Sequence, residues 1–288
     1  MNHRVIGAIF SAAIFCAGTA DARGITDESS TRQTFKFAGT APHTLEVRAI
    51  NGSITVEAYD GNEVEMTINR RVQAETDDGL RTALREVTLD TSNNAAKVGV
   101  IVRQPHMGVC GDDDPWEGHT PRRHYYVQFD FTVRVPRNTT LQLCSINKSD
   151  ITVEGTRGDF SIHSINGRIT MTDMGGSGEA VTINGRVTAS FVAAPRADSL
   201  FKTINGDVVV SVPDGLSADL RMKSFNGGLY TDFEAQPLPT PVRAGVERHN
   251  GLFVYRSNDF TSVRVGGGGP ELTLETLNGD VRVLRQSR

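Results

Sequence analysis

This chain has little tryptophan and cysteine, and its net charge is small. Its 288 residues include one Trp and three Cys, and 34 acidic side chains against 30 basic ones give a net charge of −4. No basic stripe stands out, which argues against a nucleic-acid partner. Long apolar runs are missing beyond the N-terminal region, so no transmembrane segment is expected in the mature chain.

Motifs for bound phosphate, calcium or a catalytic nucleophile are missing as well. The glycine run at 266–269 is not followed by Lys-Ser/Thr or by a helical pattern, and it lacks the Asp placement of calcium-binding nonapeptide repeats. His163 and His249 are isolated. The recurring Ser and Thr residues are better explained as a polar ladder on a strand face than as nucleophiles, which would need a nearby base. We expect no cofactor and no catalytic residue.

The first 22 residues are typical of a secretory signal peptide. Arg4 supplies a positive charge, residues 5–17 are apolar or small, and the Ala-Asp-Ala sequence at 20–22 fits a small-x-small cleavage site. The apolar run is too short for a transmembrane helix. We expect residues 23–288 to form a single exported repeat domain, in the periplasm or at the cell surface.

A short motif recurs along most of the chain. It is usually an apolar residue, Asn and Gly, followed by alternating apolar and polar residues. Asn147, Asn166, Asn184 and Asn205 are 19, 18 and 21 residues apart, a period typical of repeat architectures in which each unit covers its neighbour. The predicted repeat corners are Asn51, Asn147, Asn166, Asn184, Asn205, Asn226, Asn250 and Asn278.

Each repeat unit is predicted to contain two strands and two corners. Side chains alternate on both sides of the Asn-Gly pair with the period of a half-buried strand. A second turn-rich segment follows about half a period later. We therefore expect an all-β solenoid, similar to a parallel β-helix, with the asparagine corners stacked about 4.8 Å apart. A β-meander or β-sandwich is the alternative, since one unit has room for two antiparallel strands.

The same pattern predicts which residues face the core. The isoleucines before the corner asparagines are expected to stack, with Ile183 buried and Arg186 in solvent. A weaker repeat unit is expected at 67–72. A short helix is predicted at 76–86, because Thr76 is a good N-cap and acidic residues follow it.

Residues 104–124 interrupt the repeats and are predicted to form an inserted loop, because they include three prolines and three glycines. Trp116 lies here, either as the anchor of the loop or as an exposed platform for a sugar ring or a peptide. The insertion also has metal-ligating residue types, namely His106, Cys110, His119, His124 and the aspartates at 112–114. Their spacing matches no metal motif, so we predict no metal site.

Cys110 and Cys144 are the two cysteines of the mature chain. Export to an oxidising compartment favours a disulfide between them, which would tether the insertion to the repeats. The bridge would close a loop of about 34 residues and contribute about 3–4 kcal/mol of stability in the loop-entropy model.

A family resemblance rests on these residues. The Val-Pro turn at 135–136 is followed by Leu-x-Leu at 141–143 and by copies of N-G-D-[IV]-x-V. This combination resembles the bacterial putative-adhesin repeat domains of unknown function. The resemblance covers about residues 34–283, departs from the pattern in the insertion, and has Lys148 in place of a corner Gly. It implies a β-solenoid in the cell envelope and no particular activity, since the motif residues form turns and core.

Three classes of function are compatible with the sequence. The first is a non-catalytic adhesin-like or scaffold protein that presents a rigid face to a protein or glycan partner. The second is a carbohydrate-active parallel β-helix enzyme, although the acidic residues are spread over separate corners such as Asp150, Asp207 and Asp280. The third is a metal-dependent envelope sensor that uses the insertion. We predict the first class, with Trp116 and an exposed polar strand face along the coils as contact surfaces.

Overall fold

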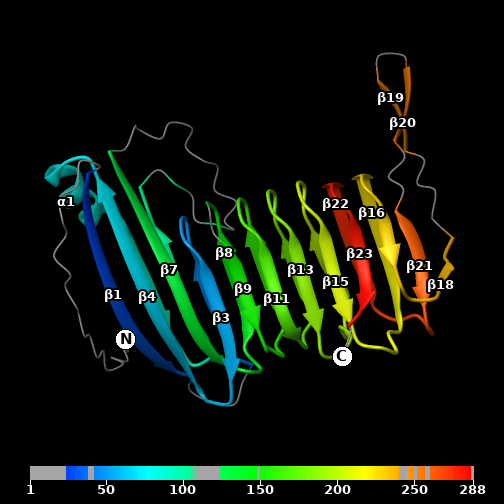
Figure 1. Ribbon diagram of the computed structural model, residues 1–288, viewed down its shortest axis with the longest axis horizontal. Coiled ribbons are helices and arrows are strands. Elements are labelled where there is room, and N and C mark those ends of the chain that lie inside the picture. Colours follow the sequence, from blue (N-terminus) through cyan, green and yellow to red (C-terminus); the bar gives the residue numbers. More distant parts are fainter. Residues whose placement is uncertain are drawn as a thin grey trace.

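Two large β-sheets form the protein, with their apolar faces toward each other (Figure 1). The computed structural model describes residues 24–37, 42–105, 107, 110, 124–147, 150–239, 245–249, 252–256 and 260–286. The predicted signal peptide at 1–22 lies outside these residues. The described part of the chain is all-β apart from one helix.

The first sheet has ten strands. From one edge to the other they are β1 (Ile25–Lys36), β4 (Glu63–Ala74), β7 (Tyr125–Pro136), β3 (Ile54–Tyr59), β9 (Ile151–Glu154), β11 (Ile169–Met174), β13 (Val187–Phe191), β15 (Val208–Val212), β23 (Val281–Arg285) and β17 (Leu229–Thr231). The strands β1, β4 and β7 are antiparallel neighbours. Every pair from β7 to β17 is parallel.

The second sheet has eleven strands. Their order is β18 (Ala235–Pro237), β21 (Thr261–Val265), β16 (Ala218–Asn226), β22 (Glu271–Asn278), β14 (Ser199–Lys202), β12 (Gly178–Val181), β10 (Phe160–Ser164), β8 (Thr140–Ser145), β2 (Thr44–Arg48), β6 (Lys97–Arg103) and β5 (Thr88–Asn93). The pairs from β16 to β6 are parallel, and the outermost pairs are antiparallel. A separate hairpin consists of β19 (Gly245–His249) and β20 (Leu252–Arg256).

From β8 to β15 the chain alternates between the two sheets, one strand at a time. Each pair of strands is one coil, and neighbouring coils pair in parallel and in register. The segments around Ile165 and Ile183 therefore pair in parallel, through a bridge between Asn166 and Asn184 and a bond of 2.8 Å from the Asn184 N–H to the Ile165 carbonyl. An antiparallel meander would not contain this pairing.

The coils do not follow chain order at the C-terminal end. The last coil, β22 with β23, lies between β14–β15 and β16–β17. Asn278 therefore bridges Asn205, and its other neighbour is Asn226. At the opposite end, β2 and β3 lie beside β8 and β9 although about ninety residues separate them in the chain.

The core lies between the sheets and consists of stacked aliphatic and aromatic side chains. One row from the ten-stranded sheet is fully buried and contains Ile151, Ile169, Val187, Val208 and Val281. On the facing sheet the buried row contains Leu143, Ile162, Ala180, Phe201 and Leu274. Burial of such rows is the main favourable term in folding this sequence.

In the isoleucine stack Ile183 and Ile204 are exposed, so the predicted burial of Ile183 is wrong. Alternation in β14 puts Phe201 inside and Lys202 outside, and the same period continues to a buried Thr203 and an exposed Ile204. Ile183 is 39% exposed for the same reason. The buried hydroxyls bond to a neighbouring corner. Thr182 donates to the Gly167 carbonyl at 2.9 Å, and Thr203 donates to the Gly185 carbonyl at 2.8 Å.

Glycine at the corners is required by the close approach of neighbouring coils. A Cβ on Gly185 would lie 2.2 Å from the carbonyl oxygen of Gly167 in the adjacent coil. The backbone of Gly185 does not adopt a positive φ, so its lack of a side chain, not its conformational freedom, suits it to this position.

The predicted short helix is present as α1 (Asp77–Glu86). The Thr76 hydroxyl accepts a hydrogen bond of 3.1 Å from the Gly79 N–H, as an N-cap should. No helix in the described residues is long and apolar enough to span a membrane. The weak repeat unit expected at 67–72 is wrong, because Asn69 lies in the middle of the long strand β4 and pairs with Asp130 across an antiparallel ladder.

A disulfide joins Cys110 to Cys144, with the two Cα atoms 5.7 Å apart. It attaches the insertion to the end of β8. The guanidinium of Arg48 donates to the Cys110 carbonyl at 3.2 Å and supports the same attachment.

We predict that Ile162→Ala lowers the free energy of unfolding by about 2–4 kcal/mol, because the side chain is fully buried between the sheets. Ile183→Ala, a matched change on the outer surface, should cost less than about 1 kcal/mol. Urea denaturation of both variants measures the difference. Equal costs would contradict the inward and outward assignment of these strands.

Reduction of the disulfide is predicted to lower stability by about 3–4 kcal/mol, since the bridge closes a loop of 34 residues. The double variant Cys110→Ser/Cys144→Ser should match the reduced wild type in chemical denaturation. If reduction leaves the midpoint of unfolding unchanged, the bridge does not contribute to stability.

Candidate functional site

The sequence-predicted contact and metal residues of the insertion are only partly described. Trp116, His106 and His119 lie outside the described residues, as does Asn250. Cys110 is in the disulfide, so its sulfur is not available as a thiolate ligand. The ring of His124 lies 2.8 Å from a carboxylate oxygen of Glu75. Within the described ranges, no group of three or more His, Cys, Asp or Glu side chains is placed to hold a metal ion.

The corner asparagines form a hydrogen-bonded row along one edge of the coils. From Asn184 onward, each side-chain amide donates to the amide oxygen of an asparagine in the adjacent coil, at 2.8 Å from Asn184 to Asn166 and 2.7 Å from Asn205 to Asn184. The row continues through Asn278 to Asn226, with both bonds at 2.7 Å. The Asn51 amide instead donates to the Val127 carbonyl at 2.8 Å. The role of this row is mainly structural, because the side-chain amides use one another as hydrogen-bond donors and acceptors.

Beside this row runs a ridge of apolar side chains whose exposure increases toward the C-terminal coils. Ile50 and Ile146 are buried, Ile183 and Ile204 are exposed, and Phe225 is 73% exposed. The ridge has the same spacing as the coils, because each member precedes a corner asparagine. It gives this edge of the molecule an apolar line next to a polar one.

A row of threonines crosses the outer face of the ten-stranded sheet. Strand pairing places six of them side by side on six adjacent strands. In spatial order they are Thr67, Thr132, Thr55, Thr152, Thr170 and Thr188. All six are half-buried or exposed. None of their hydroxyls has a hydrogen-bond partner within the described part of the chain, so they are available to a ligand or to water.

The threonine row ends in an aromatic and a cationic side chain. It continues through Val209 and Arg282 to Tyr230 on β17. The ring of Tyr230 is 49% exposed, and the guanidinium carbon of Arg282 lies 5.3 Å from its centroid. An exposed tyrosine on the same sheet face as these hydroxyls, three strands beyond Thr188, adds a stacking surface to the hydrogen-bonding groups, and both glycans and extended peptides use the two together.

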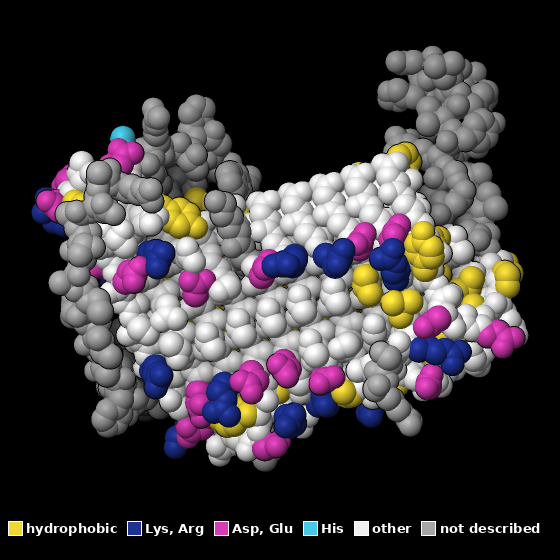
Figure 2. Space-filling model, in the orientation of Figure 1, with side chains coloured by type: hydrophobic (Ala, Val, Ile, Leu, Met, Phe, Trp, Pro, Cys, Tyr) yellow, Lys and Arg dark blue, Asp and Glu magenta, His cyan; other side chains and the backbone are white. Residues whose placement is uncertain are grey.

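A line of ion pairs lies between the threonine row and the asparagine row. Arg168 contacts Asp150 at 2.7 Å, and Arg186 contacts Asp207 at 2.6 Å. Figure 2 shows this face as a broad uncharged band bordered by charged side chains. Because the charges of this line are paired, the line itself carries little net field.

The aspartates of this line also fasten neighbouring coils together. The Asp150 carboxylate accepts from the Arg168 N–H at 2.9 Å, and the Asp207 carboxylate accepts from the Asp280 N–H at 3.0 Å. The side-chain hydrogen bond from Arg168 holds the pKa of Asp150 below its usual value. The bond from the Asp280 backbone, assisted by Arg186, does the same for Asp207.

A cluster of Ser161, His163 and Glu179 lies on the other sheet, beside a cavity of about 280 Å³ next to the disulfide. The His163 Nε2 is 2.8 Å from the Glu179 carboxylate and 3.2 Å from the Ser161 hydroxyl. Burial alone would raise the pKa of Glu179, but the hydrogen bonds from His163 and Ser161 outweigh it and lower the pKa. A nucleophilic triad needs the acid and the hydroxyl on opposite ring nitrogens, so this arrangement does not activate Ser161.

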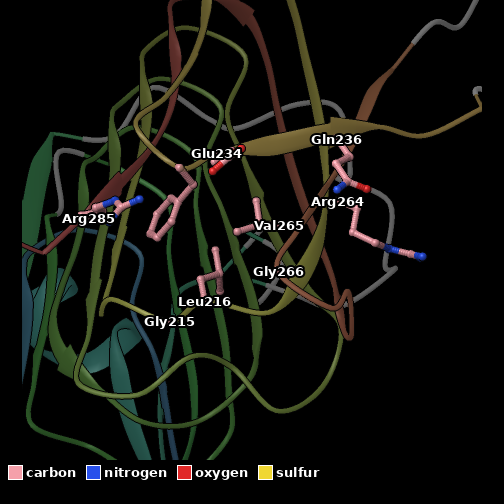
Figure 3. A pocket seen from close by; sticks show the side chains of 9 residues that line it. Gly215, Leu216, Glu234, Gln236, Arg264, Val265, Gly266 and Arg285 are labelled. Carbon is pink, nitrogen blue, oxygen red and sulfur yellow. The ribbon is translucent and has the colours of Figure 1, made fainter.

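A second cavity, of about 380 Å³, opens at the C-terminal end of the coils (Figure 3). Leu216 and Val265 point into it, while Arg264 points away toward Asp219, which accepts two bonds from it at 2.7 and 2.8 Å. Arg285 stacks over the Phe233 ring at 5.0 Å. Both guanidinium groups are thus already engaged within the protein.

Comparison with known proteins gives remote likenesses. No protein-family model and no curated protein matches the chain. The chain is similar to a putative cell adhesion protein from Clostridium sporogenes, at 6% identity and a TM-score of 0.43, over 89% of this chain and 100% of that one. It is also similar to a putative lipid binding protein from Parabacteroides distasonis, at 6% identity and a TM-score of 0.33, over 90% and 97% of the two chains. A putative adhesin from Bacteroides fragilis has 7% identity and a TM-score of 0.24, over 89% and 97%. At these TM-scores the likeness carries no argument about function.

The depressed pKa values of Asp150 and Asp207 predict a loss of stability in acid. A carboxyl group whose pKa is lower in the folded state stabilises the protein above its unfolded pKa, here about 3.8. That stability is lost as the pH falls through the folded value. Asp207→Asn retains an oxygen that can accept from the Asp280 N–H but cannot titrate. The free energy of unfolding should therefore fall less steeply below about pH 4 in the variant than in the wild type. Identical pH profiles would contradict this assignment.

Proposed function

We propose that this protein is a non-catalytic, exported β-solenoid, adhesin-like or scaffold in role, that presents its outer sheet face to a protein or glycan partner. The parallel, in-register coils from β8 to β15 support the solenoid description. The N-terminal signal-like sequence and the disulfide support export to an oxidising compartment, periplasmic or at the cell surface.

The threonine row is the observation that carries the binding role. Six hydroxyls without a hydrogen-bond partner among the described residues, together with their methyl groups, form a long, regular surface that ends at the exposed Tyr230. Such a surface suits an extended partner that makes many similar contacts. Thr stacking also stabilises a sheet through cross-strand packing, so binding must be tested directly.

The enzyme alternative can be tested on a pair of neighbouring exposed carboxylates. Glu57 and Glu154 are register partners on β3 and β9 and both are exposed on this same face. Most glycoside hydrolases need two carboxyl groups that flank the scissile bond. Neither glutamate lines either of the two cavities described above, and we propose that the pair is not catalytic.

We predict that Thr170→Arg weakens binding of a partner by at least about tenfold, because a long charged side chain in the middle of the row blocks close contact. Glycan and protein arrays identify the partner, and titration of the variant measures the effect. Thr273→Arg is the matched control, since Thr273 is a half-buried threonine on the outer face of the opposite sheet.

Two results would contradict the proposal. Equal binding by the Thr170→Arg and Thr273→Arg variants would place the contact surface elsewhere. Turnover of any arrayed glycan that disappears in Glu154→Gln would establish an enzyme instead. The arrays are run with and without zinc or calcium, so that a metal-dependent sensor is detected by a requirement for the ion.

A further inference from the structure

The strand β1 leaves one long edge without a described partner. Its twelve residues pair with β4 along one side only. It contains no Pro or Gly. The other terminal strands are much shorter, with three residues in β17 and β18 and six in β5. A long, regular edge of this kind is a template for pairing with another strand, unless it is blocked.

The charges of β1 are ordered so that the strand complements a reversed copy of itself. Acidic Asp27 and Glu28 are in its first half, and basic Arg32 and Lys36 are in its second half. We propose that two copies of the exported chain dimerise through their β1 edges, antiparallel, about a two-fold axis at Ser30. The ten-stranded sheet of one copy then continues into that of the other.

A continuous antiparallel sheet restricts which residues can meet. Facing residues point to the same side of the sheet, so exposed side chains face exposed ones. From Glu28 to Lys36 the even-numbered side chains of β1 are exposed and the odd-numbered ones are half-buried. With the axis at Ser30, Glu28 faces Arg32 of the second copy on the exposed side. On the half-buried side, Ile25 faces Phe35 of the second copy.

Other positions of the axis lose these matches. An axis at Ser29 sets Glu28 against Ser30 and forms no charge pair. An axis at Arg32 sets Glu28 against Lys36, but it brings the two copies of Arg32 together at the axis, and like charges in facing positions destabilise a sheet. It also sets no apolar pair such as Ile25 with Phe35. The register about Ser30 supplies two opposite-charge pairs and two apolar pairs, because the symmetry forms each contact twice.

Arg32 is the charged side chain of β1 that would gain an ion-pair partner in the dimer. It stands opposite Thr67 and has no ion-pair partner among the residues that the structure describes. The remaining charged residues of the strand are already paired within the chain. These ion pairs are Asp27 with Arg70 at 3.1 Å, Glu28 with Arg71 at 2.8 Å and Lys36 with Glu63 at 3.0 Å. In the dimer, Glu28 would lie between Arg71 of its own chain and Arg32 of the second copy.

Cysteine cross-linking tests the register. Since Cys110 and Cys144 are bonded to each other, an introduced cysteine is the free thiol of the exported protein. In the Ser30→Cys variant, the new cysteine faces the same cysteine of the second copy across the axis, so the variant should form a disulfide-linked dimer under mild oxidation. Thr34→Cys faces Thr26 of the second copy and lies eight positions from its counterpart, so it should not. Equal cross-linking by both variants, or by neither, would overturn the proposal.

Sedimentation equilibrium of the exported protein tests the association itself. The wild type should dimerise, and Arg32→Glu should weaken the dimer by about tenfold or more, because it replaces two opposite-charge pairs with like-charge pairs. Arg196→Glu, with the same charge change on the exposed loop between β13 and β14, should leave the dimer unchanged. Melting curves verify that each variant is folded. A wild type that remains monomeric up to about 0.1 mM would overturn the proposal.

Discussion

Parallel backbone pairing between neighbouring coils is the interaction on which the rest of this structure depends. When one coil hydrogen-bonds to the next in register, each side chain lies about 4.8 Å from the side chain at the same position of its neighbour. Asparagine therefore stacks on asparagine and valine on valine. Pairing this close leaves no room for a side chain at position 185, where the Cα of Gly185 lies against the carbonyl of Gly167 in the adjacent coil.

The same constraint produces the surfaces of the protein. Three parallel lines run along the coils, namely the asparagine row with its apolar ridge, the ion pairs and the threonine row. The first two are occupied with holding neighbouring coils together, whereas the hydroxyls of the third are left to solvent. A surface repeated at the spacing of a strand suits an extended partner better than a small molecule.

A stack of paired coils also has to end somewhere. The C-terminal end is closed by short strands and by antiparallel β21, and the N-terminal end by the long strands β7, β4 and β1 with α1 packed beside them. Each added strand satisfies the edge of the one before it and exposes a new edge of its own. We propose the last of these edges as an interface between two copies, and it adjoins the face that we propose for a partner, because Arg32 stands opposite Thr67.

The sequence by itself determined the repeat period, the asparagine corners and the α1 helix, because these depend on residues close in the chain with narrow conformational preferences. It did not show which of the two residues before each corner asparagine faces the core. The side chain of Thr203 points to the core, where its hydroxyl donates a hydrogen bond to the carbonyl of Gly185. That carbonyl belongs to the neighbouring coil, so the sequence around Thr203 does not contain it. In the threonine row, Thr132 likewise lies between Thr67 and Thr55. This order differs from the order of the three residues in the chain, so the repeat spacing could not predict it. Tertiary structure alone decided both features, since each depends on which strands become neighbours.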